Sequence, residues 1–167
     1  HDWIAMTEQG MPLAPELGPH WAEIGKRIDK IPINRSTFGF IDYDYSFNNM
    51  FYDGRRLTVI DHNAAFGFFA IDLASVVSGH VFGSLKATTQ RRYWRRFIEA
   101  YRAETHFDSS WIPWLHALQD YKRLGFYLVN LTWKAEGKDS YDFPMMETRR
   151  REMLENRPTF DFDLSLP

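Results

Sequence analysis

The segment "NMFYDGRRLTVID", residues 49–61, restricts the fold more than any other part of the 167-residue chain. Its Asp-Gly pair lies between two runs of β-forming residues, and such a pair in that setting is a strong signal for a tight hairpin. With residues 53–56 as the loop, Tyr52 pairs with Leu57 and the residues on either side pair in turn. Because side chains alternate along a strand, this register determines which residues come together at the open end.

Asn49 and Asp61 leave the open end of this hairpin side by side, because Asn49 pairs with Ile60 in that register. An amide oxygen and a carboxylate are hard ligands that Mg²⁺ accepts, with water and phosphate oxygens completing the octahedron. Asp44 lies on the loop that enters the hairpin, and its interval to Asn49 is that of the protein-kinase catalytic loop. On spacing alone, a solvated hairpin end with no cation is the favoured interpretation, since Asp and Asn are common turn residues.

The composition is that of an ordinary globular domain, with 44% hydrophobic and 25% charged residues. A net charge of −2 favours neither nucleic acid nor an anionic membrane as a partner. The absence of Cys excludes disulfides, thiolate metal sites and Cys nucleophiles. No apolar run approaches the roughly 20 residues that span a bilayer, so we expect a cytoplasmic protein. The first residue is His rather than Met, and we therefore expect a fragment of a longer protein.

Helical periodicity predicts a chain that is α+β and mainly α. Residues 1–18 contain two Pro and two Gly and are expected to form an irregular lead-in. A strand is expected at residues 36–42, before the hairpin, and Ser109 or Ser110 is expected to cap the longest helix. The expected helices lie at residues 19–31, 69–82, 87–105, 110–134 and 144–155.

The residues "FGFIDYDYSFNNMFYDGRRLTVIDHNAAFGFFAIDLA" resemble the catalytic core of the aminoglycoside phosphotransferase and choline kinase-like family. That family shows an apolar strand, H-G-D or H-N-D, four residues, Asn, a hairpin, I-D and then D-L-A. The resemblance implies that Asp44 is the catalytic base, that Asn49 and Asp61 bind Mg²⁺, and that Asp72 braces the catalytic loop. It also implies transfer of the γ-phosphoryl group of ATP to the hydroxyl of a small molecule.

The resemblance covers most of residues 19–164. "RRFIEAYRAETHFDSSWIPWLHALQDYKRLGFYLVNL" is similar to paired C-lobe helices, and "ETRRREMLENRPTFDFDL" resembles the closing helix of the homoserine-kinase-like and stress-response-kinase-like branch. No Gly-rich loop or strand Lys occurs upstream of residue 40. Residues 19–167 therefore resemble a kinase-like C-terminal lobe whose partner is its own N-lobe. Because the family holds ATP between its lobes, we expect this chain alone to be inactive and to self-associate through an exposed aromatic face.

The family's H-x-D triplet is replaced here by Asp42, Tyr43 and Asp44. The His of that triplet supports the loop, so its replacement need not abolish chemistry. Asp42 stays open between a loop cap and an altered member of the active site. The alternative function is a non-catalytic pseudokinase-like or helical scaffold domain, which the altered triplet favours and the intact pair of Asn49 and Asp61 opposes.

Other patterns in the sequence predict no further chemistry. The arginine runs at residues 91–96 and 149–151 fit solvated helix faces, and Asp53 fits a turn residue. The histidines lack the i, i+4 spacing of a zinc pair, notably His62, His80, His106 and His116. The acceptor stays open among an aminoglycoside, choline, homoserine and similar hydroxyl compounds, although nearby acidic residues favour a cationic one.

Overall fold

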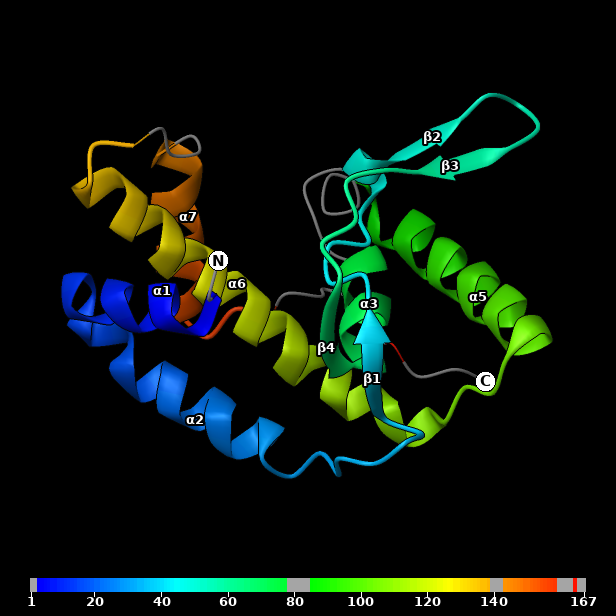
Figure 1. The fold of residues 1–167 in the computed structure, drawn as a ribbon, viewed down its shortest axis with the longest axis horizontal. Coiled ribbons are helices and arrows are strands. Elements are labelled where there is room, and N and C mark those ends of the chain that lie inside the picture. The colour runs from blue at the N-terminus through cyan, green and yellow to red at the C-terminus, as the bar shows by residue number, and fades with distance from the viewer. Residues whose placement is uncertain (1–2, 78–84, 139–142, 159–163, 165–167) are drawn as a thin grey trace. The chain divides into compact units, whose positions relative to one another are not determined.

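A computed structural model describes residues 3–77, 85–138, 143–158 and 164 (Figure 1). The helices and strands are α1 (Trp3–Gly10), α2 (Gly18–Ile28), β1 (Phe38–Ile41), β2 (Met50–Tyr52), β3 (Leu57–Val59), β4 (Ala65–Phe68), α3 (Phe69–Val76), α5 (Ala87–Glu104), α6 (Ile112–Ala135) and α7 (Phe143–Leu154). Short 3-10 helices lie at Met11–Leu13, Pro15–Leu17, Phe47–Asn49 and Ser109–Trp111. The chain divides into two compact units, residues 1–30 with 120–158 and residues 31–119 with 159–167.

The expected fold class is confirmed, because the described residues are mainly helical with two small antiparallel sheets. α2, α5, α6 and α7 lie within a few residues of the helices expected at those places. The helix expected at residues 69–82 is α3, which ends at Val76, and residues 78–84 lie outside the described residues. None of the helices in the described part of the chain is long and apolar enough to cross a membrane.

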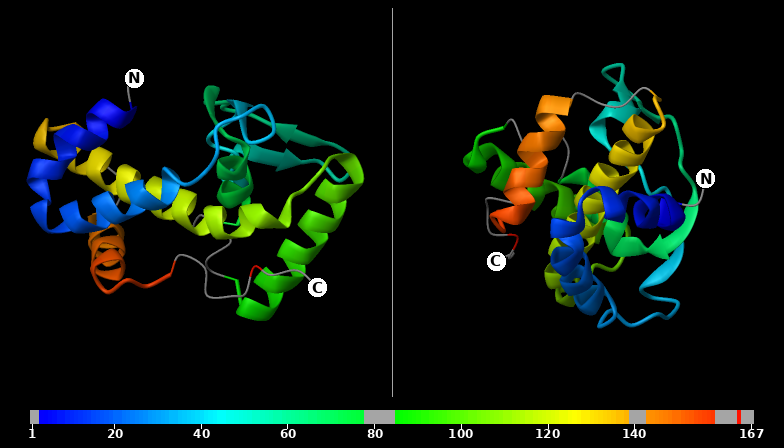
Figure 2. Two further views of the ribbon diagram at one scale, coloured as in Figure 1. Left: turned by 90° about the horizontal axis from the view of Figure 1, so that it is seen from below. Right: turned by 90° about the vertical axis from the view of Figure 1, so that its left-hand side faces the viewer.

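The first unit is held together by apolar side chains from several helical segments. Figure 2 shows the ribbon of these segments in two views. Leu124 and Leu128 lie one turn apart on α6, and Met146 and Met153 lie two turns apart on α7, so both helices contribute to this core. Each fully buried side chain of this size contributes about 1.5–3 kcal/mol to stability. The buried cluster consists of Ala14, Leu17, Ile24, Leu124, Tyr127, Leu128, Met146 and Met153.

The expectation of an irregular lead-in over residues 1–18 is wrong. α1 occupies much of this segment, and Pro12 and Pro15 lie in the first turns of short 3-10 helices, where a missing N–H costs little. Gly10, which suggested a break, instead permits close packing. A Cβ atom there would lie 2.3 Å from the carbonyl oxygen of Leu128 on α6. The segment is therefore part of the first unit's core.

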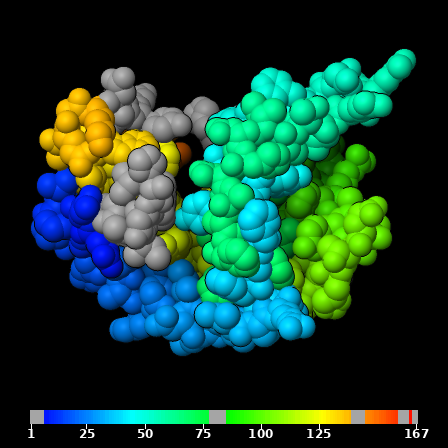
Figure 3. Space-filling model, in the orientation of Figure 1, coloured from blue at the N-terminus to red at the C-terminus, as the bar shows by residue number. Residues whose placement is uncertain are grey.

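In the second unit β1 pairs antiparallel with β4, a strand that the sequence did not predict. One face of this sheet carries two edge-to-face ring pairs, with centroids 5.3 and 5.9 Å apart, formed by Phe38 with Phe68 and Phe40 with Phe66. The atoms of β1 and β4, cyan and green in Figure 3, lie uncovered on the face shown. On the opposite side, a Cβ on Gly39 would lie 2.7 Å from the Phe69 ring, so β1 packs closely on the start of α3.

The hairpin of β2 and β3 has the predicted register at all of its described pairs, with Tyr52 opposite Leu57. Asp53 is a turn residue, as expected, and its carboxylate accepts hydrogen bonds from the backbone N–H groups of Arg56 and Arg55, each at 2.8 Å. These two bonds lower the pKa of Asp53 because they stabilise its charged form. The turn chemistry therefore fixes the register, as the sequence indicated.

α5 contributes a buried face to the second unit and exposes the arginines of its 91–96 run. Trp94 is 2% exposed, and its Nε1–H donates to the carbonyl oxygen of Leu164 at 3.0 Å. The predicted solvated face is confirmed by this burial pattern. The 3-10 turn leading into α6 is capped by Asp108, which accepts a bond from the Ser110 N–H at 2.8 Å, and not by either serine that we expected.

Candidate active site

Asp72 connects α3 to the loop that precedes the hairpin. It lies in the first turn of α3, and its two carboxylate oxygens accept hydrogen bonds from the backbone N–H of Asp42 at 2.9 Å and of Tyr43 at 2.8 Å. Tyr43 has a φ of 67°, which a bulky residue rarely adopts. Two bonds to a charged acceptor therefore hold the loop at its least favourable residue.

Asn49 lies at the end of a 3-10 turn that brings it back against Asp44. Its Nδ2 donates to the carbonyl oxygen and to the carboxylate Oδ2 of Asp44, each at 3.0 Å. The turn is closed by a bond from the Asn49 N–H to the Ser46 carbonyl oxygen at 3.0 Å. Since its amide nitrogen is directed to Asp44, the Oδ1 atom is the remaining polar atom of the Asn49 side chain.

Asp61 follows the last bond of the hairpin. The Ile60 N–H donates to the carbonyl oxygen of Asn49 at 2.9 Å, which extends the predicted register by one pair. Asp61 then has a φ of 54°, in the left-handed region, and its side chain is exposed. The backbone therefore brings Asn49 and Asp61 to the same end of the hairpin, as the turn chemistry indicated.

His62 is a residue of this site that the sequence analysis considered only as a zinc ligand. Its Nδ1 lies 2.5 Å from Oδ2 of Asp42, so the residue after Asp61 contacts the residue that precedes Tyr43. The available signal was an acid at position 42, where the resembled family has His, together with a His directly after the I-D pair. Asp42 and His62 are 20 residues apart in the sequence, so no local pattern indicated that they would pair.

Aromatic side chains border the loop on the α5 side. The Phe47 ring meets the Tyr93 ring edge-on at 5.3 Å. Burial, with a smaller effect from Tyr45, raises the pKa of Tyr93 to about 12. Burial and then the negative charge of Asp72 raise the pKa of Tyr101. Both phenols therefore stay neutral near pH 7 and act as hydrogen-bonding and packing groups rather than as bases.

The donor atoms at the open end of the hairpin fit a divalent cation that prefers oxygen. Asn49 offers Oδ1 and Asp61 offers an exposed carboxylate, and both are hard ligands. Among the residues that the structure describes, no three His, Cys, Asp or Glu side chains gather as a metal-binding group. Two protein ligands leave most of an octahedral shell to water and to phosphate oxygens, which is how Mg²⁺ is commonly bound beside nucleotides.

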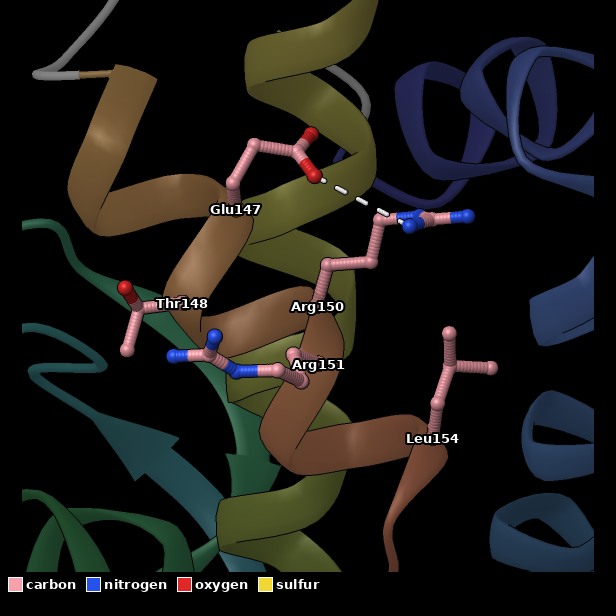
Figure 4. A pocket seen from close by; sticks show the side chains of 5 residues that line it. All are labelled: Glu147, Thr148, Arg150, Arg151 and Leu154. Atoms are coloured by element: carbon pink, nitrogen blue, oxygen red, sulfur yellow. Dashed lines mark ion pairs between the residues drawn. The ribbon is translucent and has the colours of Figure 1, made fainter.

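Arg150 and Arg151, from the arginine run at residues 149–151, line a hollow of about 290 Å³ on α7, in the first unit (Figure 4). Arg150 forms ion pairs with Glu16 and, at 3.8 Å, with Glu147. The Arg149 guanidinium lies over the Phe126 ring at 5.4 Å. Two of the three arginines thus make contacts within the protein, and the hollow gathers no set of catalytic groups.

Comparison with known proteins finds a similarity in structure rather than in sequence. No protein-family profile matches the chain, and no curated protein matches it in sequence. A solved structure, amicoumacin kinase hAmiN in complex with AMP-PNP, Ca²⁺ and Ami, matches with a TM-score of 0.69 and 16% sequence identity. The match covers 98% of this chain and 48% of that chain.

This similarity shows that the chain has a kinase-like fold. At 16% identity it carries the fold and does not distinguish the homoserine-kinase-like branch from others. The chain spans about half the length of the matched kinase, since 48% of that chain is covered. The activity of the whole protein and the roles of Asp44, Asn49, Asp61, Asp42 and Asp72 therefore remain predictions.

Proposed function

We propose that this chain is the C-terminal lobe of an ATP-dependent phosphotransferase that acts on a small-molecule hydroxyl. The observation that carries the proposal is the bonding of Asn49 to Asp44, in a loop that Asp72 holds by two backbone N–H groups. In a chain with a kinase-like fold, this bonding supports a site in which the Asp44 carboxylate lies beside an oxygen donor, the side chain of Asn49. Phosphoryl transfer requires those two functions.

Asp44 serves as the general base in the proposed reaction. Its Oδ2 accepts a bond from Asn49, which orients the carboxylate and leaves Oδ1 for the acceptor hydroxyl. The hydroxyl oxygen attacks the γ-phosphorus, its proton passes to Asp44, and the bond to the leaving phosphate oxygen breaks. Asn49 and Asp61 hold Mg²⁺, which neutralises phosphate charge when bound.

A second lobe completes the nucleotide site in this proposal. The matched kinase was solved with AMP-PNP. The match covers 98% of this chain and 48% of the kinase, which is therefore about twice as long. We therefore expect the isolated chain to hold ATP weakly and to turn over slowly. The parent protein should phosphorylate a hydroxyl compound of the aminoglycoside, choline or homoserine type.

The test is turnover by the parent protein with Mg²⁺-ATP and a panel of these acceptors. Asp44→Asn should lower kcat by about 10²–10⁴-fold, because the amide cannot accept the proton. Asp53→Asn is the matched control, since Asp53 lies in the exposed turn of the same hairpin and should leave kcat unchanged. Near-wild-type turnover by Asp44→Asn would refute the role of this residue.

The rival function is a non-catalytic scaffold or pseudokinase-like domain, which the replacement of His by Asp42 favours. Isothermal titration of Mg²⁺-ATP into the parent protein separates the two. Binding that disappears in Asp61→Ala supports the phosphotransferase. A folded parent protein that shows no binding would favour the scaffold.

A further inference from the structure

The contact between Asp42 and His62 joins two segments that the proposed mechanism uses separately. The Asp42 side chain is 14% exposed and the His62 side chain is 61% exposed. Their closest atoms, Oδ2 and Nδ1, are 2.5 Å apart. Because an ionised carboxylate can only accept, the imidazole donates its Nδ1–H. The contact is therefore directional as well as close.

Both segments contain a non-glycine residue in the left-handed region. Tyr43 follows Asp42 directly and has a φ of 67°, while Asp61 precedes His62 directly and has a φ of 54°. Such conformations are unfavourable for residues with side chains, and they persist where surrounding contacts hold them. The bond between Asp42 and His62 therefore joins the residue before Tyr43 to the residue after Asp61.

The contacts form a continuous series from α3 to the hairpin. Asp72 holds the backbone N–H groups of Asp42 and Tyr43, and the Asp42 side chain then reaches His62. Asp61 is covalently next to His62. In the described part of the chain Asp61 makes no hydrogen bond of its own, while the side chain of its neighbour His62 is held by Asp42.

We propose that His62 is a positioning residue that acts through Asp42 to fix Asp61 against the loop carrying Asp44. The inference rests on the proposed function, because it concerns the placement of a cation ligand in that site. An exposed ion pair contributes little to overall stability. The expected effect of losing His62 is therefore on local order and cation affinity rather than on folding.

The experiment uses the full 167-residue chain and the variants His62→Ala and His62→Asn. The amide nitrogen of Asn can take the place of the imidazole Nδ1, so His62→Asn keeps a donor for Asp42 whereas His62→Ala removes it. His106→Gln is the matched control, because His106 is exposed in the same unit and its charge acts on Asp108 instead.

The first measurement is amide hydrogen exchange without metal. The Ile60 N–H makes the last hairpin bond before Asp61, and its exchange should accelerate about tenfold in His62→Ala. It should return close to the wild-type rate in His62→Asn and be unchanged in the His106 control. An unchanged Ile60 rate in His62→Ala overturns the inference.

The second measurement is the binding of Mn²⁺, added without nucleotide. Paramagnetic broadening of the Asn49 side-chain amide signal reports the binding. His62→Ala should weaken the apparent affinity about 10–100-fold, the usual cost of losing a residue that orients a metal ligand, and His62→Asn should restore most of it. If the wild-type chain binds Mn²⁺ and His62→Ala binds it with the same affinity, the inference about His62 is wrong, whereas the proposed function is not affected. Absence of Mn²⁺ binding by the wild-type chain counts against the proposed function instead.

Discussion

Replacing Asp72 tests how the loop of the candidate site is held. Its carboxylate accepts two backbone bonds, from Asp42 at 2.9 Å and Tyr43 at 2.8 Å, and both bonds are partly buried. A donor left unsatisfied in such a place costs about 1–3 kcal/mol. Loss of both bonds in Asp72→Ala should therefore destabilise the loop by about 2–4 kcal/mol, since water reaches partly buried groups to some extent. Asp72→Asn keeps one acceptor oxygen and should cost about half as much.

The assay is amide hydrogen exchange at Asp42 and Tyr43, because it reports on the loop itself. A protein of two units does not guarantee a single unfolding transition, so a midpoint from one global probe would be ambiguous. About 2–4 kcal/mol corresponds to exchange roughly 30- to 1,000-fold faster, at 1.4 kcal/mol for each factor of ten. The Asp72→Asn variant should lie between wild type and Asp72→Ala.

Asp53 provides a control with the same bonding and a different environment. Its carboxylate also accepts two backbone bonds, from Arg55 and Arg56 at 2.8 Å, but in an exposed turn where water can replace them. Asp53→Ala should therefore change exchange at those two amides far less. If the loop amides in Asp72→Ala respond no more than the turn amides in Asp53→Ala, the proposed bracing role is wrong.

Further predictions concern stability rather than activity. Gly10→Ala should destabilise the first unit by about 1–3 kcal/mol, because its Cβ would meet the backbone oxygen of Leu128 at 2.3 Å. Gly25→Ala, on α2 with open space around the added Cβ, should instead stabilise by about 0.5–1 kcal/mol, and urea unfolding compares the two. Tyr93, with a pKa raised to about 12, loses its proton in the unfolded chain near pH 10 but not in the folded one, so stability should fall between about pH 10 and 12. Urea unfolding across that range should show a smaller fall in Tyr93→Phe and an unchanged fall in Tyr52→Phe, whose side chain is 70% exposed.

The hairpin could be predicted because its information is local. The Asp53-Gly54 turn fixes the register of β2 and β3, and that register brings Asn49 and the segment of Asp61 together. Asp44 comes within reach of Asn49 through a short 3-10 turn. Each step depends on residues close in sequence, where turn preference and strand alternation are strong.

β4 and α1 could not be predicted, because each depends on a partner far away in the chain. Gly67 lies in the middle of β4, where a glycine locally disfavours a strand, yet a Cβ there would lie 2.6 Å from the Ile41 side chain on β1. Gly10 suggested an irregular segment, yet it allows α1 to approach Leu128. In both cases the glycine permits close packing that a local pattern cannot reveal.

The structure also explains why an altered triplet does not disrupt the loop. Asp72 bonds to the backbone N–H groups of Asp42 and Tyr43, which almost any residue would supply. The side chain at position 42 is therefore not required for this support, and an acid can replace a histidine without loss of these two bonds. Because the Asp42 side chain does not support the loop backbone, it is available to contact another residue, and here it contacts His62. An acid at position 42 is thus weak evidence against a working site, because the loop has its backbone support from Asp72 and the Asp42 side chain contacts His62 beside Asp61.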